Sequence, residues 1–146
     1  MFTIDASVWV NAESPAEPGQ PESRALLDAL FASRQRIIVP TLLPVEIAGV
    51  IARSRTDSAL GARMAAVIFN IPMLQWVDLD EAFARQAADL AAAHRLRGAD
   101  AVYAAVAVAH GCDLVSLDRE HLTRLTAVVR TLTPADALTR LRSSKP

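Results

Sequence analysis

The chain has 146 residues, of which 52% are hydrophobic and 21% are charged. This length suits a single domain over residues 1–146, and the composition excludes intrinsic disorder and collagen-like sequence. Fifteen basic residues against sixteen acidic ones give a net charge of −1, which excludes a protein that coats nucleic acid with bulk positive charge. Cys112 is the only cysteine, so a disulfide framework and a cysteine-rich zinc module are also excluded.

Membrane and secretory segments are not expected. The longest apolar run covers nine residues, 101–109, which is about half of what a membrane-spanning helix needs. The N-terminus has no basic region, and Asp5 interrupts it before an apolar leader is formed. We therefore expect a cytoplasmic protein with no membrane partner.

The first half of the chain alternates between short strand-like runs and helical stretches. We expect a strand over residues 2–5, a short apolar helix or turn through Ala12, and a proline-rich loop over 13–22 in which Pro21 opens the next helix. That helix extends to about residue 34 and is followed by a strand over 36–40. Thr41 is the expected N-cap of a helix over 42–53, and a further helix covers 57–70.

The second half continues the alternation. We expect a strand over residues 74–78, a helix capped by Asp80 that extends to about residue 94, and a helix over 98–110 that is closed by Gly111. Strands are expected over 114–117 and 128–132, before a last helix from Thr133 and a frayed tail over 141–146. The strands lack strict alternation and are separated by helices. The pattern therefore predicts an α/β fold with a parallel sheet covered on both faces.

Four acidic residues are notable for where they lie in apolar sequence. Asp5, Glu46 and Asp100 are each the only charge in an apolar segment, and Asp118 directly follows the apolar run 114–117. A buried carboxylate is costly unless it is paired or binds a cation. Asp5 and Asp118 follow expected strands, and Asp100 and Glu46 lie in the first turns of expected helices. In an open parallel sheet these positions meet at the edge where ligands bind, so we expect the four carboxylates to converge.

Each acid also has an ordinary structural interpretation. Asp5 is consistent with a turn after a strand, and Asp100 and Asp118 are each consistent with a helix N-cap. Glu46 is consistent with a solvated helix end. These interpretations suit any one of the four acids better than they suit all four together.

Convergence of the carboxylates would require a counter-charge. Two carboxylates about 4 Å apart repel each other by roughly 4 kcal/mol at an effective dielectric of 20. Oxygen ligands without nearby Cys or His favour Mg²⁺ or Mn²⁺. Ser7 and Ser116 each lie two residues from an acid, where a hydroxyl would orient a water or a phosphate oxygen, although ordinary turn hydrogen bonds explain each serine singly. Hydrolysis of a phosphodiester by metal-activated water is the reaction that suits this set.

The four acidic segments together resemble the ordered motifs of a known family. Ile4-Asp5-Ala6-Ser7, Val45-Glu46-Ile47 with Arg53 beyond it, Gly98-Ala99-Asp100-Ala101 and Val115-Ser116-Leu117-Asp118-Arg119 are similar to the motifs of PIN-domain proteins, and more narrowly of VapC-like toxins. The resemblance covers residues 2–138.

This resemblance implies a three-layer α/β/α sandwich and Mg²⁺- or Mn²⁺-dependent endoribonuclease activity on an RNA substrate. It also implies a homodimer and a cognate VapB-type antitoxin partner. Asp5, Glu46, Asp100 and Asp118 would be the catalytic metal ligands, with Ser7 and Ser116 in support. The chain departs from the family pattern at His121, where an aromatic residue is common, and at Pro44-Val45, where a polar residue often precedes the glutamate.

Other side chains have two interpretations each. Arg53, Arg97 and Arg119 flank acids and suit contacts with RNA phosphates, but they equally suit a solvated surface. Trp9 is expected in the core rather than stacked on a base, and Cys112 is expected to be a small buried residue. An apolar set suits either the core or a groove for an antitoxin helix or a second subunit: Met64, Ile68, Phe69, Ile71 and Met73.

Three rival functions would each need different features in the sequence. A regulatory module with the same fold would hold a cation without catalysis, and only an activity measurement separates it from a nuclease. A receiver or phosphotransferase needs a second acid beside Asp5 and a buried lysine, whereas the only lysine is Lys145. A nucleotide-binding protein needs a glycine-rich phosphate loop, and the five glycines form none.

Overall fold

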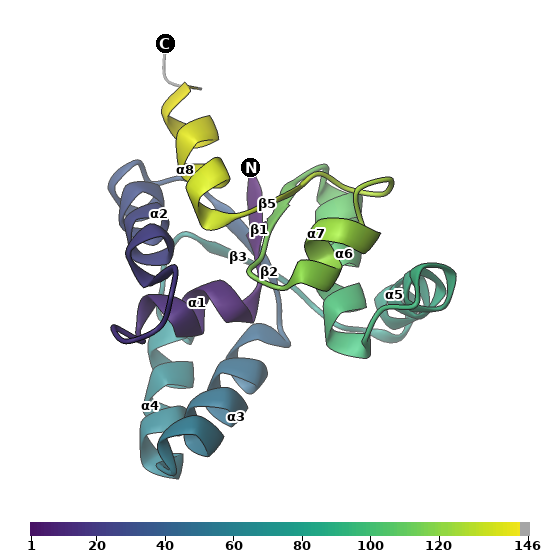
Figure 1. The fold of residues 1–146 in the computed structure, drawn as a ribbon. Coiled ribbons are helices and arrows are strands. Elements are labelled where there is room, and N and C mark those ends of the chain that lie inside the picture. The colour runs from purple at the N-terminus through teal and green to yellow at the C-terminus, as the bar shows by residue number, and fades with distance from the viewer. Residues whose placement is uncertain (144–146) are drawn as a thin grey trace.

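The protein is built around one sheet of five parallel strands (Figure 1). The structure is a computed structural model that describes residues 1–143, with only the backbone of Glu120. The strands are β1 (Phe2–Ile4), β2 (Ile37–Pro40), β3 (Leu74–Val77), β4 (Asp113–Val115) and β5 (Thr131–Leu132), in the order β3-β2-β1-β4-β5. In the register, Phe2 of β1 lies opposite Ile37 on one side and Asp113 on the other. The parallel sheet predicted from the helix-separated strands is confirmed.

Helices cover both faces of the sheet. The first four are α1 (Ala6–Ala12), α2 (Gln20–Ala32), α3 (Leu43–Arg55) and α4 (Ser58–Phe69). The others are α5 (Glu81–His94), α6 (Gly98–His110), α7 (Arg119–Arg124) and α8 (Pro134–Ser143). In Figure 1, α1, α2 and α8 lie on one side of the sheet and α5, α6 and α7 on the other, while α3 and α4 pack together below it. This is the expected three-layer arrangement.

Several element boundaries follow the predicted signals. Asp57 and Asp80 cap α4 and α5, and their carboxylates accept hydrogen bonds of 2.8 Å from the backbone N–H groups three residues on. Gly111 ends α6 in the left-handed conformation with a φ of 59°, which glycine adopts without strain. Pro21 lies in the first turn of α2, which begins one residue earlier than expected.

Other expectations were wrong. Thr41 does not cap α3: the N-cap position is Leu42, and the Thr41 hydroxyl instead accepts a hydrogen bond from the backbone N–H of Leu79. The strand expected over 114–117 ends at Val115, because the chain turns toward α7, a helix that the sequence pattern did not indicate. Leu141 is buried in α8 rather than frayed, and residues 144–146 of the expected tail lie outside the described residues.

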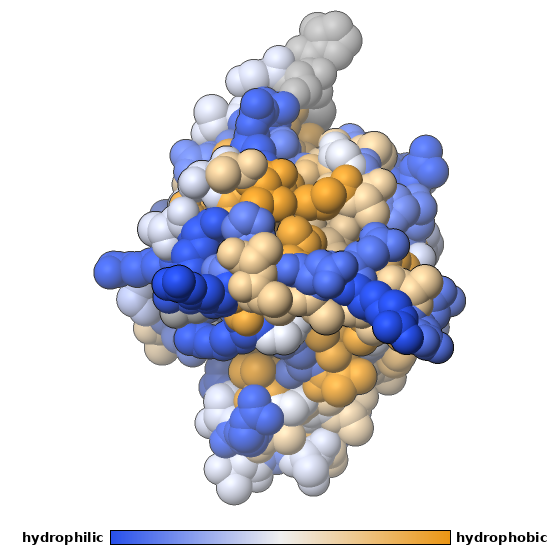
Figure 2. Space-filling view, turned by 90° about the vertical axis from the view of Figure 1, so that its right-hand side faces the viewer, coloured by the Kyte–Doolittle hydropathy of each residue, from blue (hydrophilic) through white to orange (hydrophobic). Residues whose placement is uncertain are grey.

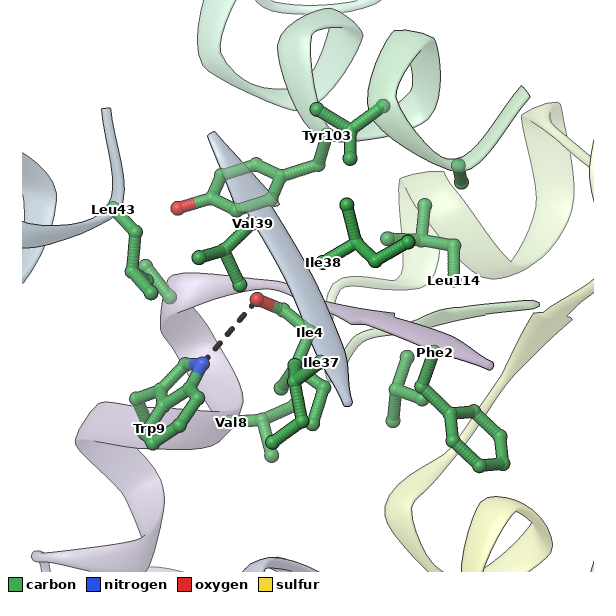
Figure 3. Close-up of a cluster of buried hydrophobic side chains, with 14 of the residues drawn as sticks. Phe2, Ile4, Val8, Trp9, Ile37, Ile38, Val39, Leu43, Tyr103 and Leu114 are labelled. Carbon is green, nitrogen blue, oxygen red and sulfur yellow. Dashed lines mark hydrogen bonds between the residues drawn. The ribbon is translucent and has the colours of Figure 1, made fainter. Parts of the chain in front are cut away.

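The core lies on both faces of the two central strands. Residues of β1 and β2 are all buried, as expected for strands covered by helices on both sides. Figure 3 shows Tyr103 of α6 beside Val39 on one face, and Trp9 of α1 on the other, where its ring nitrogen donates to the Ile4 carbonyl at 3.3 Å. Each fully buried aliphatic side chain contributes about 1.5–3 kcal/mol relative to exposure.

The helix pair below the sheet depends on a close backbone approach. A Cβ at Gly61 of α4 would lie 2.6 Å from the Ala48 carbonyl oxygen of α3. Only glycine therefore allows α3 and α4 to pack at this separation.

The strand order produces a topological switch point at the centre of the sheet. The chain leaves β1 toward β2 on one side and later returns to β4 on the other, so β1 and β4 form a topological switch point. Ligands of open α/β sheets bind beyond the carboxyl ends of the strands at such points. Among residues 1–143, no helix is both long and apolar enough to cross a membrane.

Candidate active site

All four predicted acids stand at the beginning of a helix, on the side of the sheet where the strands end. Asp5 is the N-cap residue of α1 and directly follows β1. Glu46 and Asp100 lie in the first turns of α3 and α6, and Asp118 directly precedes α7. The positive ends of the helix dipoles stabilise carboxylates at these positions, each by about 0.3–1 kcal/mol.

Asp5 is fixed by two serine hydroxyls. Its Oδ2 accepts hydrogen bonds from Ser7 Oγ at 2.5 Å and from Ser116 Oγ at 3.0 Å, and the residue is buried. Ser7 Oγ also accepts the backbone N–H of Leu117, so β1 and the segment after β4 are tied together. The two serines predicted to support a ligand thus orient Asp5 itself.

Glu46 is a half-buried carboxylate in a crowded electrostatic environment. Burial raises its pKa above the ordinary value, and the negative charges of Asp5 and Asp100 raise it further. The Tyr103 hydroxyl and His121 act in the opposite direction. Glu46 therefore lies within electrostatic range of both Asp5 and Asp100.

Tyr103 provides the polar group that faces Glu46 from α6. Its side chain is fully buried, and its hydroxyl points toward the start of α3 in Figure 3. Burial raises the pKa of Tyr103, and the charges of Glu46 and Asp5 raise it further. The hydroxyl is therefore neutral and interacts with the Glu46 carboxyl, although its oxygen has no hydrogen-bond partner among the residues that the structure describes.

His121 of α7 links Asp100 to the segment after β4. Its Nδ1 lies 2.8 Å from Ser116 Oγ, and its Nε2 lies 3.4 Å from Asp100 Oδ1. Burial alone would lower the pKa of His121, but the contact with Asp100 and the charges of Asp5, Asp100 and Asp118 outweigh that effect and raise it. The ring is fully buried, in the middle of the acidic residues.

Asp118 is more exposed to solvent than Asp100 and Asp5. Its side chain is 27% exposed, against 13% for Asp100, and its Oδ2 lies 3.7 Å from the Arg97 guanidinium. Its backbone N–H donates to Ser116 Oγ at 3.0 Å. Asp118 therefore borders the buried acids at the solvent side.

Two observations bear on whether these residues suit a divalent ion. Within residues 1–143, no group of three or more His, Cys, Asp or Glu side chains is already arranged to hold a metal ion. Glu46 Oε2 and Asp100 Oδ2, however, are buried oxygens with no hydrogen-bond partner in the described part of the chain. Mg²⁺ usually keeps several waters and is held by only one or two carboxylates, so the donor set suits a hard divalent ion without three direct ligands.

Some functional candidates were not found from the sequence. The sequence places Tyr103 in a buried apolar helix without indicating a polar partner, and it shows His121 only as a departure from the family pattern. The spacing Ser116-x-Asp118-x-x-His121 is the signal that would have found His121, because a helix start after Asp118 turns the ring back toward Ser116. At the other departure, Pro44 is buried in the first turn of α3 and Val45 is 65% exposed.

The remaining candidates are distributed over surface and core. Arg53, Arg97 and Arg119 are exposed. Trp9 and Cys112 are buried, as predicted. Figure 2 faces the α5, α6 and α7 side, where hydrophobic surface is interrupted by charged side chains.

An apolar pocket lies between α1, α2, α3 and α4, away from the acids. It has a volume of about 170 Å³, and Trp9, Met64, Ile68 and Ile71 are among its lining residues. Met73 lines a neighbouring hollow, and Phe69 is 59% exposed and packs against Trp76. The apolar set noted in the sequence is therefore divided between these surfaces. Glu13, Arg24 and Asp28 form the charged rim of the pocket.

The family profile of the PIN domain matches residues 2–128, so the chain belongs to the PIN domain family. No curated protein sequence matches the chain significantly.

Solved structures with the same fold come from several organisms. The chain is similar to VapC20 of Mycobacterium tuberculosis, described as a toxin that cleaves the sarcin–ricin loop, with 16% identity and a TM-score of 0.70 over 88% of this chain and 96% of that one. It is also similar to PAE2754 of Pyrobaculum aerophilum, with 20% identity and a TM-score of 0.69 over 98% and 96%. A toxin–antitoxin complex from Klebsiella pneumoniae matches with 18% identity and a TM-score of 0.63 over 92% and 98%. At these identities the likeness establishes a shared fold.

Proposed function

We propose that the protein is a metal-dependent endoribonuclease and the toxin of a VapBC-type toxin–antitoxin module. The observation that supports the proposal is that Asp5, Glu46 and Asp100 all begin helices and that the charges of Asp5 and Asp100 act on Glu46. One oxygen each of Glu46 and Asp100 is buried and has no hydrogen-bond partner among the described residues. A carboxylate group of this kind is unfavourable in an empty interior and favourable beside a divalent cation. Membership of the PIN domain family supports a nuclease.

The four acids would have different roles in binding Mg²⁺ or Mn²⁺. Asp5, already fixed by Ser7 and Ser116, and Asp100 are the ligands that need the least rearrangement. Glu46 and Asp118 would complete the site directly or through water. Such an ion activates water at neutral pH and neutralises phosphate charge. The raised pKa of Glu46 also suits this carboxyl for accepting a proton during hydrolysis.

RNA would approach from the solvent side, where Asp118 lies. Arg97 is 70% exposed and lies beside Asp118, and Arg119 follows directly on α7. Guanidinium groups bind phosphate oxygens in pairs and position the backbone without reading the sequence. Arg53 near the end of α3 is a more distant candidate for the same role.

The decisive test is cleavage of a labelled RNA by purified protein with Mg²⁺ or Mn²⁺. We expect cleavage that EDTA abolishes and added Mn²⁺ restores, and a loss of at least 100-fold in D5N and D100N with circular dichroism unchanged. Arg142→Ala, an exposed change at the far end of α8, is the matched control and should cleave like the wild type. Cleavage that persists in EDTA and in D100N would reject the proposal. A chain that binds Mn²⁺ but cleaves no RNA would instead be the catalytically inactive binding module.

The partner we propose is a VapB-type antitoxin whose apolar segment occupies the pocket lined by Trp9, Met64 and Ile68. The apolar lining and the charged rim of Glu13, Arg24 and Asp28 suit an amphipathic peptide segment. The related fold in Klebsiella pneumoniae was solved as a toxin–antitoxin complex, which supports this assignment.

Co-expression with the product of the neighbouring gene tests the partner. We expect a complex that Met64→Asp weakens and Arg142→Ala does not, together with relief of growth inhibition. We also expect a homodimer of the free chain, detectable by light scattering. A wild-type chain that forms no complex and leaves growth unaffected would refute the toxin assignment, but not the nuclease.

A further inference from the structure

We propose that His121 is a positioning residue of the active site, which donates from Nδ1 to Ser116 Oγ and thereby directs the single hydroxyl proton of Ser116 to Asp5. The ring also borders Asp100, so that one buried side chain connects the carboxylates that follow β1 and begin α6. The inference rests on the proposed function, since Asp5 and Asp100 are the proposed metal ligands.

The direction of the bonds follows from counting donors and acceptors at Ser116. A serine hydroxyl has one proton to donate and two lone pairs to accept with. Ser116 Oγ lies 3.0 Å from Asp5 Oδ2, which accepts its proton, and it accepts the backbone N–H of Asp118 at 3.0 Å. The third contact, with His121 Nδ1 at 2.8 Å, can then only be a bond that the ring donates. His121 therefore has its proton on Nδ1.

The bond from His121 Nδ1–H excludes the alternative orientation of the Ser116 hydroxyl, in which its proton points to His121. If Nδ1 had no proton, it would be an acceptor, and Asp5 and His121 would compete for the single proton of Ser116. With Nδ1–H and the Asp118 N–H occupying both lone pairs, the proton of Ser116 has one acceptor left, Asp5 Oδ2. Asp5 is then held from both sides, by Ser7 and by Ser116.

The second ring nitrogen reaches the other half of the site. Nε2 lies 3.4 Å from Asp100 Oδ1. Among residues 1–143, neither Nε2 nor Asp100 Oδ2 has a hydrogen-bond partner. The contact limits how Asp100 turns in the first turn of α6. The ring is fully buried, so in the folded protein both contacts are made away from bulk solvent.

Three substitutions separate the donor from the bulk of the ring. In H121N the side-chain amide places a donor near the position of Nδ1, whereas H121F keeps an aromatic ring without any donor. Both variants are uncharged, so a difference between them reports the hydrogen bond and not the charge. S116A removes the group through which His121 is proposed to act.

The measured quantity is the Kd for Mn²⁺, titrated calorimetrically on RNA-free protein. Supporting hydrogen bonds to metal ligands change metal affinity by about 10–100-fold when they are lost. We expect H121F and S116A each to weaken Mn²⁺ binding by about tenfold, H121N to remain within about threefold of the wild type, and S116A/H121F to be no weaker than either single variant. Melting temperatures identify any variant that does not fold. If H121F does not fold, the Mn²⁺ affinities of S116A and H121N are compared instead.

Equal Mn²⁺ affinity in folded H121F and H121N, or additive losses in S116A/H121F, would overturn the inference. A long-range ¹H–¹⁵N spectrum of the metal-free wild type gives an independent result. A protonated Nδ1 supports the inference, and a bare Nδ1 overturns it whatever the protein does with RNA. If the wild type binds no Mn²⁺ while Nδ1 is protonated, the proposed function has failed and the hydrogen-bond assignment to Ser116 stands.

Discussion

Neutralising Glu46 should stabilise the metal-free protein while removing activity. Glu46 is half-buried, and both its burial and the charges of Asp5 and Asp100 raise its pKa. A pair of carboxylates about 4 Å apart repel by roughly 4 kcal/mol at an effective dielectric of 20. Solvent screening, the Tyr103 hydroxyl and the dipole of α3 offset most of this. We expect a net gain of about 1 kcal/mol for E46Q near neutral pH, which is about 3 °C in Tm for a chain of this size.

The effect of Glu46 on stability should depend on pH. An acid with a pKa that is higher in the folded state than in the unfolded state binds its proton more tightly when folded, so the stability of the wild type decreases as the pH rises between the two values. The lower limit of this window is the ordinary glutamate value of 4.5. The advantage of E46Q should therefore be largest at neutral pH and should vanish as the pH falls toward 4.5.

Thermal unfolding in EDTA, followed by circular dichroism from pH 4.5 to 8, measures this advantage. Mn²⁺ added at ten times the wild-type Kd should raise wild-type stability by about 1.4 kcal/mol and that of E46Q by less. A Tm for E46Q several degrees below the wild type at pH 7, or a difference that does not change with pH, would refute the electrostatic account of Glu46.

Three further changes test other parts of the structure. Y103F removes the hydroxyl that faces Glu46, so the pKa of Glu46 should rise further, as a carboxyl ¹³C titration would measure; an unchanged titration would mean that the hydroxyl does not act on Glu46. G61A places a Cβ 2.6 Å from the Ala48 carbonyl oxygen and should destabilise the protein by about 1–3 kcal/mol despite the higher helix propensity of alanine, whereas equal or greater stability in urea would show that α3 and α4 separate freely. D80A removes the 2.8 Å cap of α5 and should cost about 1 kcal/mol in the same assay, and no loss would mean that water replaces the cap.

The fold was predictable where local sequence and tertiary packing agree. The buried strands β1 and β2, the cap at Asp80 and the end of α6 at Gly111 are all indicated by residues within a few positions. The prediction failed where a distant group competes. Thr41 has a side chain suited to an N-cap, but the backbone N–H of Leu79, 38 residues away, takes that oxygen. Helix α7 is six residues long and too short to show a period.

The candidate site shows the same division. The four acids could be proposed from the sequence because Asp5, Glu46 and Asp100 are isolated charges in apolar segments and Asp118 directly follows an apolar run. Their places at helix starts follow from the parallel topology. The hydrogen bonds that fix Asp5 were only partly predictable, because Ser116 reaches it across 111 positions. His121 has a local signal only for its contact with Ser116, five residues earlier, because its other partner, Asp100, comes from α6.

We propose that Asp5 and Asp100, at the starts of α1 and α6, bind a divalent ion between them. Crystals grown with Mn²⁺ and measured at a wavelength where manganese scatters anomalously test this claim directly. We expect an anomalous peak within bonding distance of carboxylate oxygens of Asp5 and Asp100, with Glu46 facing it. In D100N crystals we expect no peak there. A wild-type crystal at saturating Mn²⁺ without a peak between these carboxylates would contradict it.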